Sequence, residues 1–211
     1  MAWYEKVSPS LRFDLKRDPL TRPWTHRIGL RGVRINNASE VTNAEGTVDR
    51  YRSSSDYLEL THEMKDVRKL HPSSILTNIT AGEDWVRGSI EIKQAFTYNE
   101  RNKQFRLRAF AGSFLHKGDN PVGPLEAWGL SWGPEDLLYD HAYFERGATT
   151  RMFSKQFNEQ QGAFKTPFLQ GGSDSWIGSI NAELDFPFSF PIAVFASTGW
   201  APITTITQEG R

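Results

Sequence analysis

Cysteine is absent from this chain of 211 residues, which excludes a disulfide framework and a thiolate metal site. A net charge is also absent, because 25 Lys and Arg residues balance 25 Asp and Glu residues. Domains that bind nucleic acid usually carry a surplus of basic residues. We therefore expect no nucleic-acid partner.

Long apolar runs are missing as well. No segment approaches the ~20 consecutive apolar residues that a transmembrane helix needs. The opening residues, MAWYEKVSPS, lack the basic and apolar regions of a signal peptide. Mean hydropathy is low, at −0.54. The strands of a membrane barrel alternate lipid-facing and lumen-facing residues, which keeps averaged hydropathy weak. These absences therefore exclude a membrane helix but leave a membrane β-barrel open.

The chain does contain many aromatic residues, including 7 Trp and 14 Phe, and long segments in which apolar and polar residues alternate. The clearest is 85–98, followed after a turn by 105–115, and together they predict a long hairpin. In the first of these strands, one face carries Val86, Gly88, Ile90, Ile92, Phe96 and Tyr98, and the other carries Arg87, Ser89, Glu91, Lys93 and Thr97.

Other segments show the same pattern. Strands are predicted at 10–16, 24–36 (with a β-bulge near Gly32), 51–61, 176–186 and 192–200, and weaker ones at 137–144 and 151–157. Only Met64, Val67 and Leu70 have a helix-like spacing. We therefore predict an all-β fold, an antiparallel up-and-down β-barrel of roughly nine or ten strands with little helix. It would form a single domain over residues 1–211, and the barrel could be incomplete.

Strand length favours a membrane. Strands of soluble sandwiches have ~5–6 residues, whereas thirteen residues at ~3.3 Å each, tilted by ~40°, rise ~33 Å and cross an apolar band of ~25 Å. The turn after residue 185 reads FPFSFP, although soluble hairpin tips are usually Asn-Gly or Asp-Gly. Aromatic residues gather at membrane interfaces, and the candidates are Trp85, Tyr98, Trp176, Phe186, Phe188, Phe190 and Trp200. The alternative is that these rings fill the core of a soluble β-barrel.

Charged residues recur on the opposite face of these strands. We predict that they face the barrel lumen, and the set comprises Arg87, Glu91, Lys93, Arg106, Arg108, Glu183 and Asp185. Because both signs are present, the lumen would be crossed by ion pairs and would not select ions of one charge. Burying such charges is costly unless they are paired. The alternative is a charged face that simply meets water.

The sequence around the aromatic turn, ELDFPFSFPIAVFASTG, resembles the closing region of bacterial surface-antigen barrels. In that family a strand ending Glu-Leu-x-Phe-Pro turns into a strand reading Phe-x-Asp-x-Gly, and here Ser197 replaces the Asp. The insertase members carry a Val-Arg-Gly-Tyr/Phe motif, for which Arg146-Gly147 followed by Ala148 is only a partial match. The resemblance implies an outer-membrane location and a partial chain, and it implies neither an insertase role nor a reaction.

The run from Phe105 to Trp200 is also similar to the C-terminal barrel-like tail of large Bacteroidetes zinc aminopeptidases. Any peptidase activity would then lie outside this chain. Within it, His62-Glu63 begins the zinc-peptidase pattern H-E-x-x-H, but Asp66 stands where the second histidine is required. An acidic cluster in the segment 135–145 matches no calcium loop and is interpreted as solvated. We expect no catalytic residue, metal or cofactor here.

The function expected is therefore that of an outer-membrane β-barrel segment, serving as membrane anchor or conduit. Its partners would be the lipid bilayer and the missing segments of the same polypeptide. Two alternatives stay open. One is the non-catalytic C-terminal domain of a secreted zinc aminopeptidase, and the other is a periplasmic or secreted soluble β-barrel that binds a ligand through Trp128, Trp132 or Trp176.

Overall fold

The computed structural model describes residues 2–15, 24–42, 48–66, 71–99, 103–120, 126–130, 137–138, 140, 162, 164, 172–186 and 192–202. These residues form strands, turns and bends, with no helix among them. Nine strands build one antiparallel sheet, and two short strands pair separately. In this part of the chain, no helix is long and apolar enough to cross a membrane.

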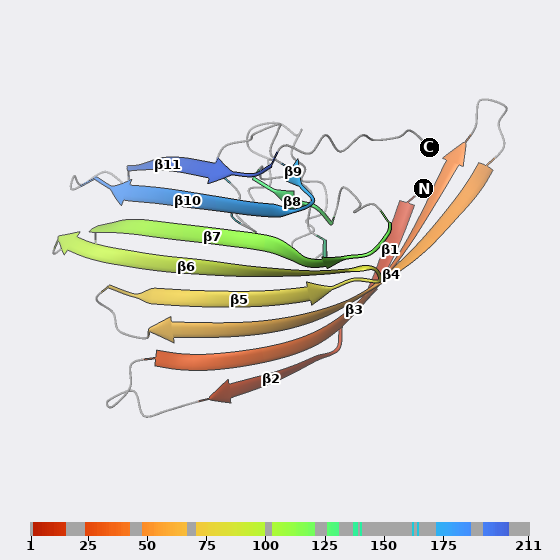
Figure 1. Cartoon of the computed structure of the whole chain (residues 1–211), viewed down its shortest axis with the longest axis horizontal. Helices are drawn as coiled ribbons and strands as arrows, with labels where there is room; N and C mark the ends of the chain where they lie inside the picture. The colour runs from red at the N-terminus through yellow and green to blue at the C-terminus, as the bar shows by residue number, and fades with distance from the viewer. Residues whose placement is uncertain are drawn as a thin grey trace.

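The main sheet follows an up-and-down order (Figure 1). Its strands are β1 (Ala2–Val7), β2 (Ser10–Leu15), β3 (Trp24–Thr42), β4 (Val48–Asp66), β5 (Ser73–Ala81), β6 (Trp85–Asn99), β7 (Lys103–Lys117), β10 (Trp176–Asp185) and β11 (Ala193–Trp200). β1 and β2 both pair with the same side of β3, so the order is β1/β2, β3, β4, β5, β6, β7, β10, β11. The predicted all-β, antiparallel up-and-down architecture is confirmed in its incomplete form, because the sheet of described strands does not close.

The strand registers sort the side chains onto two faces. Ile92 lies opposite Ala109, which in turn lies opposite Ile180, so these apolar residues share one side of β6, β7 and β10. We call this side the apolar face, and its large exposed members include Leu11, Phe13, Leu15, Ile28, Leu30, Leu58, Leu60, Ile79, Ile90, Ile92, Phe96, Tyr98, Trp176, Ile180, Leu184, Val194 and Trp200. The opposite side, which carries Arg31, Glu59, Glu91 and Arg108, is called the charged face. The period of two predicted from the sequence is what separates them.

The expected bulge at Gly32 is absent. β3 and β4 stay in one register from the pair Trp24 and Asp66 to the pair Thr42 and Val48. The alternation of apolar and polar residues changes phase at Gly32 for another reason. Beyond Gly32 the two faces of β3 exchange their polarity. The helix-like spacing was also misleading, since residues 63–66 continue β4, while 67–70 lie outside the described residues.

Two buried clusters lie against the charged face, not the apolar one. The first contains Val33, Ile35, Trp85, Leu137 and Leu138. The second contains Phe110, Trp128, Leu130 and Ile177. Its Trp128 belongs to the short pair formed by β8 (Trp128–Gly129) and β9 (Gly172–Ser173). The connection between β7 and β10 therefore supplies side chains that pack on the charged face. Leu137 and Leu138 form a turn and not the predicted strand, and 151–157 lie outside the described residues.

Candidate functional site

The apolar face is uncovered across the whole width of the sheet. Its large side chains remain exposed from Leu11 on β2, through Ile90 on β6, to Trp200 on β11. Soluble monomers rarely expose a continuous apolar patch larger than a few hundred Å². A continuous apolar surface over eight strand positions is therefore the first feature of this sheet that a functional proposal has to explain.

The predicted interface aromatics occupy three kinds of position. Tyr98, Trp176 and Trp200 are exposed on the apolar face near the ends of β6, β10 and β11. Phe186 is half-buried, and Phe188 and Phe190 lie outside the described residues.

Trp85 does not belong to the exposed set, because it is only 5% exposed. Its ring packs against Tyr57 and Phe114 on the charged side of the sheet. The sequence contained the signal for this placement, since Trp85 stands two residues before Arg87 and so shares its side of β6. A tryptophan near a strand end can thus lie on either face of the sheet. Its place in the alternation of the strand determines which face that is.

The apolar face ends at the level of Gly32. Two residues further along β3, Arg34 occupies the same side and pairs with Asp56 of β4, with 2.6 Å between Nη2 and Oδ2. Both side chains are exposed, and the hydrogen bond from Arg34 lowers the pKa of Asp56. In Figure 1, β3 and β4 continue beyond the other strands, with β1 beside them. This polar extension suits water and gives the apolar face a defined edge.

Ion pairs connect neighbouring strands on the charged face. Arg106 of β7 contacts both Glu183 and Asp185 of β10, at 2.6 and 2.7 Å. Arg108 of β7 reaches Glu91 of β6 at 2.5 Å, and Lys93 reaches the other oxygen of Glu91 at 2.6 Å. Six of the seven predicted lumen-facing charges are therefore paired with one another. Both signs are present on this face and pair across the strands.

Arg87, the seventh, is buried beneath the segment 126–130. Its Nη1 donates a hydrogen bond to the carbonyl oxygen of Glu126 at 2.7 Å. The guanidinium carbon lies 4.5 Å from the ring centroid of Trp128 and 5.4 Å from that of Trp85. Such cation–π contacts strengthen when they are shielded from water. Arg87 therefore binds the segment 126–130 to the sheet.

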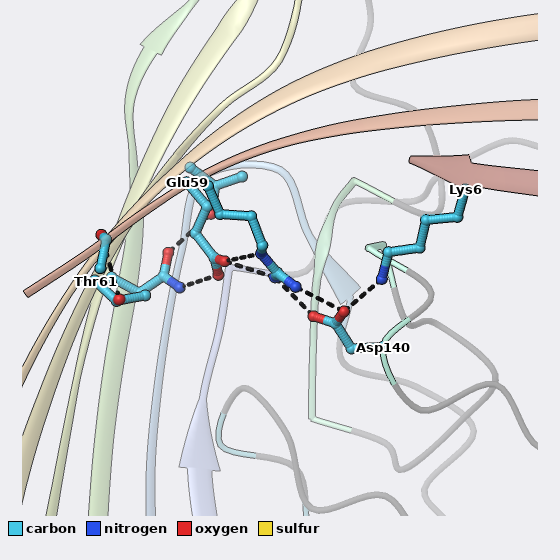
Figure 2. Close-up of polar contacts among 8 residues, drawn as sticks. Lys6, Glu59, Thr61 and Asp140 are labelled. Atoms are coloured by element: carbon cyan, nitrogen blue, oxygen red, sulfur yellow. Dashed lines mark hydrogen bonds and ion pairs between the residues drawn. The ribbon is translucent and has the colours of Figure 1, made fainter. Parts of the chain in front are cut away.

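A second connection holds Asp140 to the sheet (Figure 2). Arg31 donates to both carboxylate oxygens of Asp140, at 2.8 and 2.7 Å, and Lys6 of β1 donates at 2.5 Å. Arg31 also donates to Glu59 at 2.8 Å, and Asn78 donates to the second oxygen of Glu59 at 2.5 Å. Burial opposes ionisation of Asp140, but the hydrogen bonds from Arg31 and Lys6 outweigh it and lower its pKa.

Asp140 was assigned to a solvated acidic cluster by the sequence, and the other members, Glu135, Asp136, His141 and Glu145, lie outside the described residues. Lys6, Arg31, Glu59 and Asn78 were not among the predicted site residues. Arg31, Glu59 and Asn78 follow the alternation of β3, β4 and β5, but Asp140, which Arg31 and Lys6 contact, is far away in the sequence.

Described residues of the charged face line two cavities of similar volume. One of about 310 Å³ separates the sheet from the connecting segment and is lined by Glu59, Asn78, Arg87, Glu91, Trp128 and Asp140, among others. The other, of about 330 Å³, is lined by residues of β4, β5, β6, β7, β10 and β11, including Lys65, Ser74, Lys93, Arg106, Glu183 and Phe195. A single cavity can touch six successive strands only if the sheet curls around its charged face. This curvature is the one that a barrel wall needs.

The described residues bring together no three His, Cys, Asp or Glu side chains suited to a metal ion. Among the tryptophans considered for ligand binding, Trp128 is buried, Trp176 is exposed on the apolar face, and Trp132 lies outside the described residues. No family model, curated protein or solved structure matches the chain. The two opposed faces are therefore the features on which a function can be based.

Proposed function

We propose that this chain is part of the wall of a bacterial outer-membrane β-barrel and serves as a membrane anchor. The observation that carries the proposal is the exposed apolar face, which continues over eight strand positions and lies back to back with a paired, charged face. Barrel walls have this arrangement, with lipid on the outside and polar groups inside. The sequence resemblance to surface-antigen barrels supports the same location.

The height of the apolar face fits a bilayer. On β6 it runs from Gly88 to Tyr98. Ten steps of ~3.3 Å, tilted by ~40°, rise ~25 Å, which equals the apolar band of outer-membrane barrels. At one limit the face carries Tyr98, and past the other it becomes polar at Arg34 and Asp56. Most of the exposed large apolar residues lie within this band, as contact with the core of a bilayer would require.

An anchor is favoured over an open conduit by what occupies the charged face. Trp128, Leu130, Leu137 and Leu138 pack there, and Asp140 is fixed by the side chains of two strands. A barrel wall with this segment on its inner side has less free lumen. Ion pairs of both signs also provide no consistent field to attract one kind of ion. The segment would have to leave before solutes could pass along this part of the wall.

The edges of the sheet predict further partners. Among the described strands, β11 has no neighbour on its far side, and neither do β1 and β2. Hydrocarbon offers no hydrogen bonds, so every backbone N–H and C=O at membrane depth must be paired within the protein. We propose that additional strands, supplied by missing segments of the same polypeptide, join these edges and complete the barrel.

Refolding into lipid vesicles tests the proposal. The protein should enter the membrane fraction, resist extraction by alkaline carbonate, and migrate on a gel as a compact species that shifts only after boiling. An unfolded chain adsorbed on the vesicles would show no shift on boiling. Recovery of the folded protein in the aqueous fraction without detergent would contradict an anchoring role.

A further inference from the structure

Two histidines face each other on the apolar face, where polar groups are otherwise few. His26 of β3 and His62 of β4 bring Nδ1 and Nε2 to 3.3 Å, and their rings stack with 5.5 Å between centroids and 17° between planes. Both side chains are half-buried. Neither the membrane anchor nor the ion pairs of the charged face require this pair.

The registers add a third donor beside the imidazoles. Met64 lies directly opposite His26 and follows His62 by two residues on the same side of β4. Directly opposed residues have Cβ atoms ~4.5–5.5 Å apart, which puts the flexible thioether within reach of both rings. The other residues directly opposite these three are Leu15, Ile28, Ile75 and Thr77, none of which carries a charge, while Asp66 follows Met64 by two residues on the same side of β4.

The separation of the two nitrogens fits a shared metal ion. Nitrogen ligands bind first-row ions such as Zn²⁺ at ~2.0–2.1 Å, and a tetrahedral angle between two such bonds separates the nitrogens by ~3.3 Å. The observed distance is 3.3 Å. A neutral imidazole offers one unprotonated nitrogen as ligand, so the position now bridged by a proton is also one where an ion can bind both rings.

The donor set indicates which ion. Thioether and imidazole ligands favour soft ions such as Cu(I), whereas carboxylate and water suit hard ions. A monovalent ion also places only one positive charge on this largely apolar face, where a divalent ion would place two. We propose that His26, His62 and Met64 form a binding site for Cu(I). The site lies two residues from Trp24, at the end of β3, so ions can reach it from the water beyond the strand ends.

Silver(I) provides an air-stable probe of such a site. Calorimetric titration of Ag⁺ into the full chain in detergent micelles should show one bound ion. Loss of an outer-shell partner already weakens metal sites by about 10–100-fold, so loss of a ligand in His26→Gln or His62→Gln should weaken binding by ~100-fold or more. The matched control is His116→Gln, which removes an exposed histidine near the other end of the sheet and should leave the affinity unchanged.

Met64→Leu tests the contribution of the thioether separately from that of the two imidazoles. It should weaken Ag⁺ binding while leaving any weak Zn²⁺ binding unaffected, because Zn²⁺ depends on the nitrogens. X-ray absorption of the unmodified chain loaded with Cu(I) should show two nitrogen ligands and one sulfur ligand. That measurement requires no variant, so it decides the question even if a substitution prevents folding.

The proposal is overturned if the unmodified chain binds no Ag⁺, if the histidine variants bind as well as His116→Gln, or if the Cu(I) spectrum lacks sulfur. Binding of Zn²⁺ without Ag⁺ would also overturn it, since the site would then be an imidazole pair without soft character. Each variant is first tested for the mobility shift on boiling. If the unmodified chain shows the shift but binds no metal, the proposed metal site is contradicted and the proposed membrane anchor is not.

Discussion

Ile90 and Glu91 are neighbours on β6, yet they reverse the burial expected of a soluble protein. Ile90 is 40% exposed, whereas Glu91 is 9% exposed and holds two basic side chains. In water the apolar residue would be inside and the carboxylate outside. On this part of the sheet the apolar face is therefore the exposed one and the charged face the enclosed one, which is the arrangement that the proposed barrel wall requires.

Within β3 the relation between residue type and burial returns to that of a soluble protein beyond Gly32. Ile28 is exposed on the apolar face, but beyond Gly32 the apolar residues Val33 and Ile35 turn inward and are buried, and Arg34 faces outward. The strand continues straight through this exchange in an unbroken register with β4. The reversed burial is therefore confined to one level of the molecule, as a membrane of fixed thickness would require.

The largest effect is expected on the charged face. Arg108 and Glu91 each have 11% of their side chain exposed, and removing one partner of a buried ion pair costs about 3–5 kcal/mol of unfolding free energy. Arg108→Met should therefore destabilise strongly, as measured by urea titration in vesicles. Arg106→Met is the matched control on the same strand and face, and should cost less because Arg106 is 43% exposed. Equal losses in the two variants would show that burial does not set the strength of these pairs.

A charge on the apolar face should have the next largest effect. Ile90→Lys is expected to lower the unfolding free energy in vesicles by about 2–4 kcal/mol, the amount found for lysine at the midplane of a bilayer. Val7→Lys is the control, because Val7 is 52% exposed on the same side but lies opposite Arg34, beyond the apolar band. If both substitutions are tolerated equally, the apolar face meets water.

The attachment of the segment at Asp140 should depend on pH. The pKa of Asp140 is lowered in the folded protein, so its contribution to stability is complete above the unfolded pKa of ~3.9 and is lost as the pH falls through the lower folded value. Asp140→Asn should remove this dependence. It should also speed amide exchange at Leu137 and Leu138 by an amount equivalent to about 1.5 kcal/mol. Exchange that stays unchanged at neutral pH would show that the apolar contacts hold the segment alone.

The smallest effect is expected at Arg34, outside the band. Arg34→Gln breaks an ion pair with Asp56 in which both side chains are largely exposed, and such pairs contribute little to stability. The melting temperature in vesicles should not change measurably. A clear loss of stability would place this extension in contact with another part of the protein or with the membrane.

Much of this architecture could be predicted because it follows from the period of two. The alternation over 85–98 determines which residues of β6 share a face, and its charges pair as anticipated. Two strands of the main sheet were missed for local reasons, besides the two-residue strands β8 and β9. β1 was missed because it is short and ends just before Pro9. β5 was missed because it follows residues with a helix-like spacing, although Ile75, Thr77 and Ile79 alternate within it.

The contacts of the connecting segment could not be predicted. Lys6 and Asp140 are 134 residues apart in the sequence, and no periodic pattern links a loop carboxylate to a distant strand. Trp128 gave no indication that it would cover Arg87, since its position depends on how the connection folds back over the sheet. The alternation of residues thus predicts the main sheet, whereas the packing of the connecting segment on the charged face depends on tertiary structure.

Accessibility of spin labels along β6 tests the central claim most directly. Because the chain has no cysteine, single cysteines can be introduced from Gly88 to Tyr98 and labelled after refolding into vesicles. Lipid contact predicts high collision rates with oxygen and low rates with a water-soluble nickel chelate at every even position, and lower oxygen rates at the odd positions. High nickel accessibility at the even positions, or protection from both reagents there, would contradict the claim that the apolar face touches lipid.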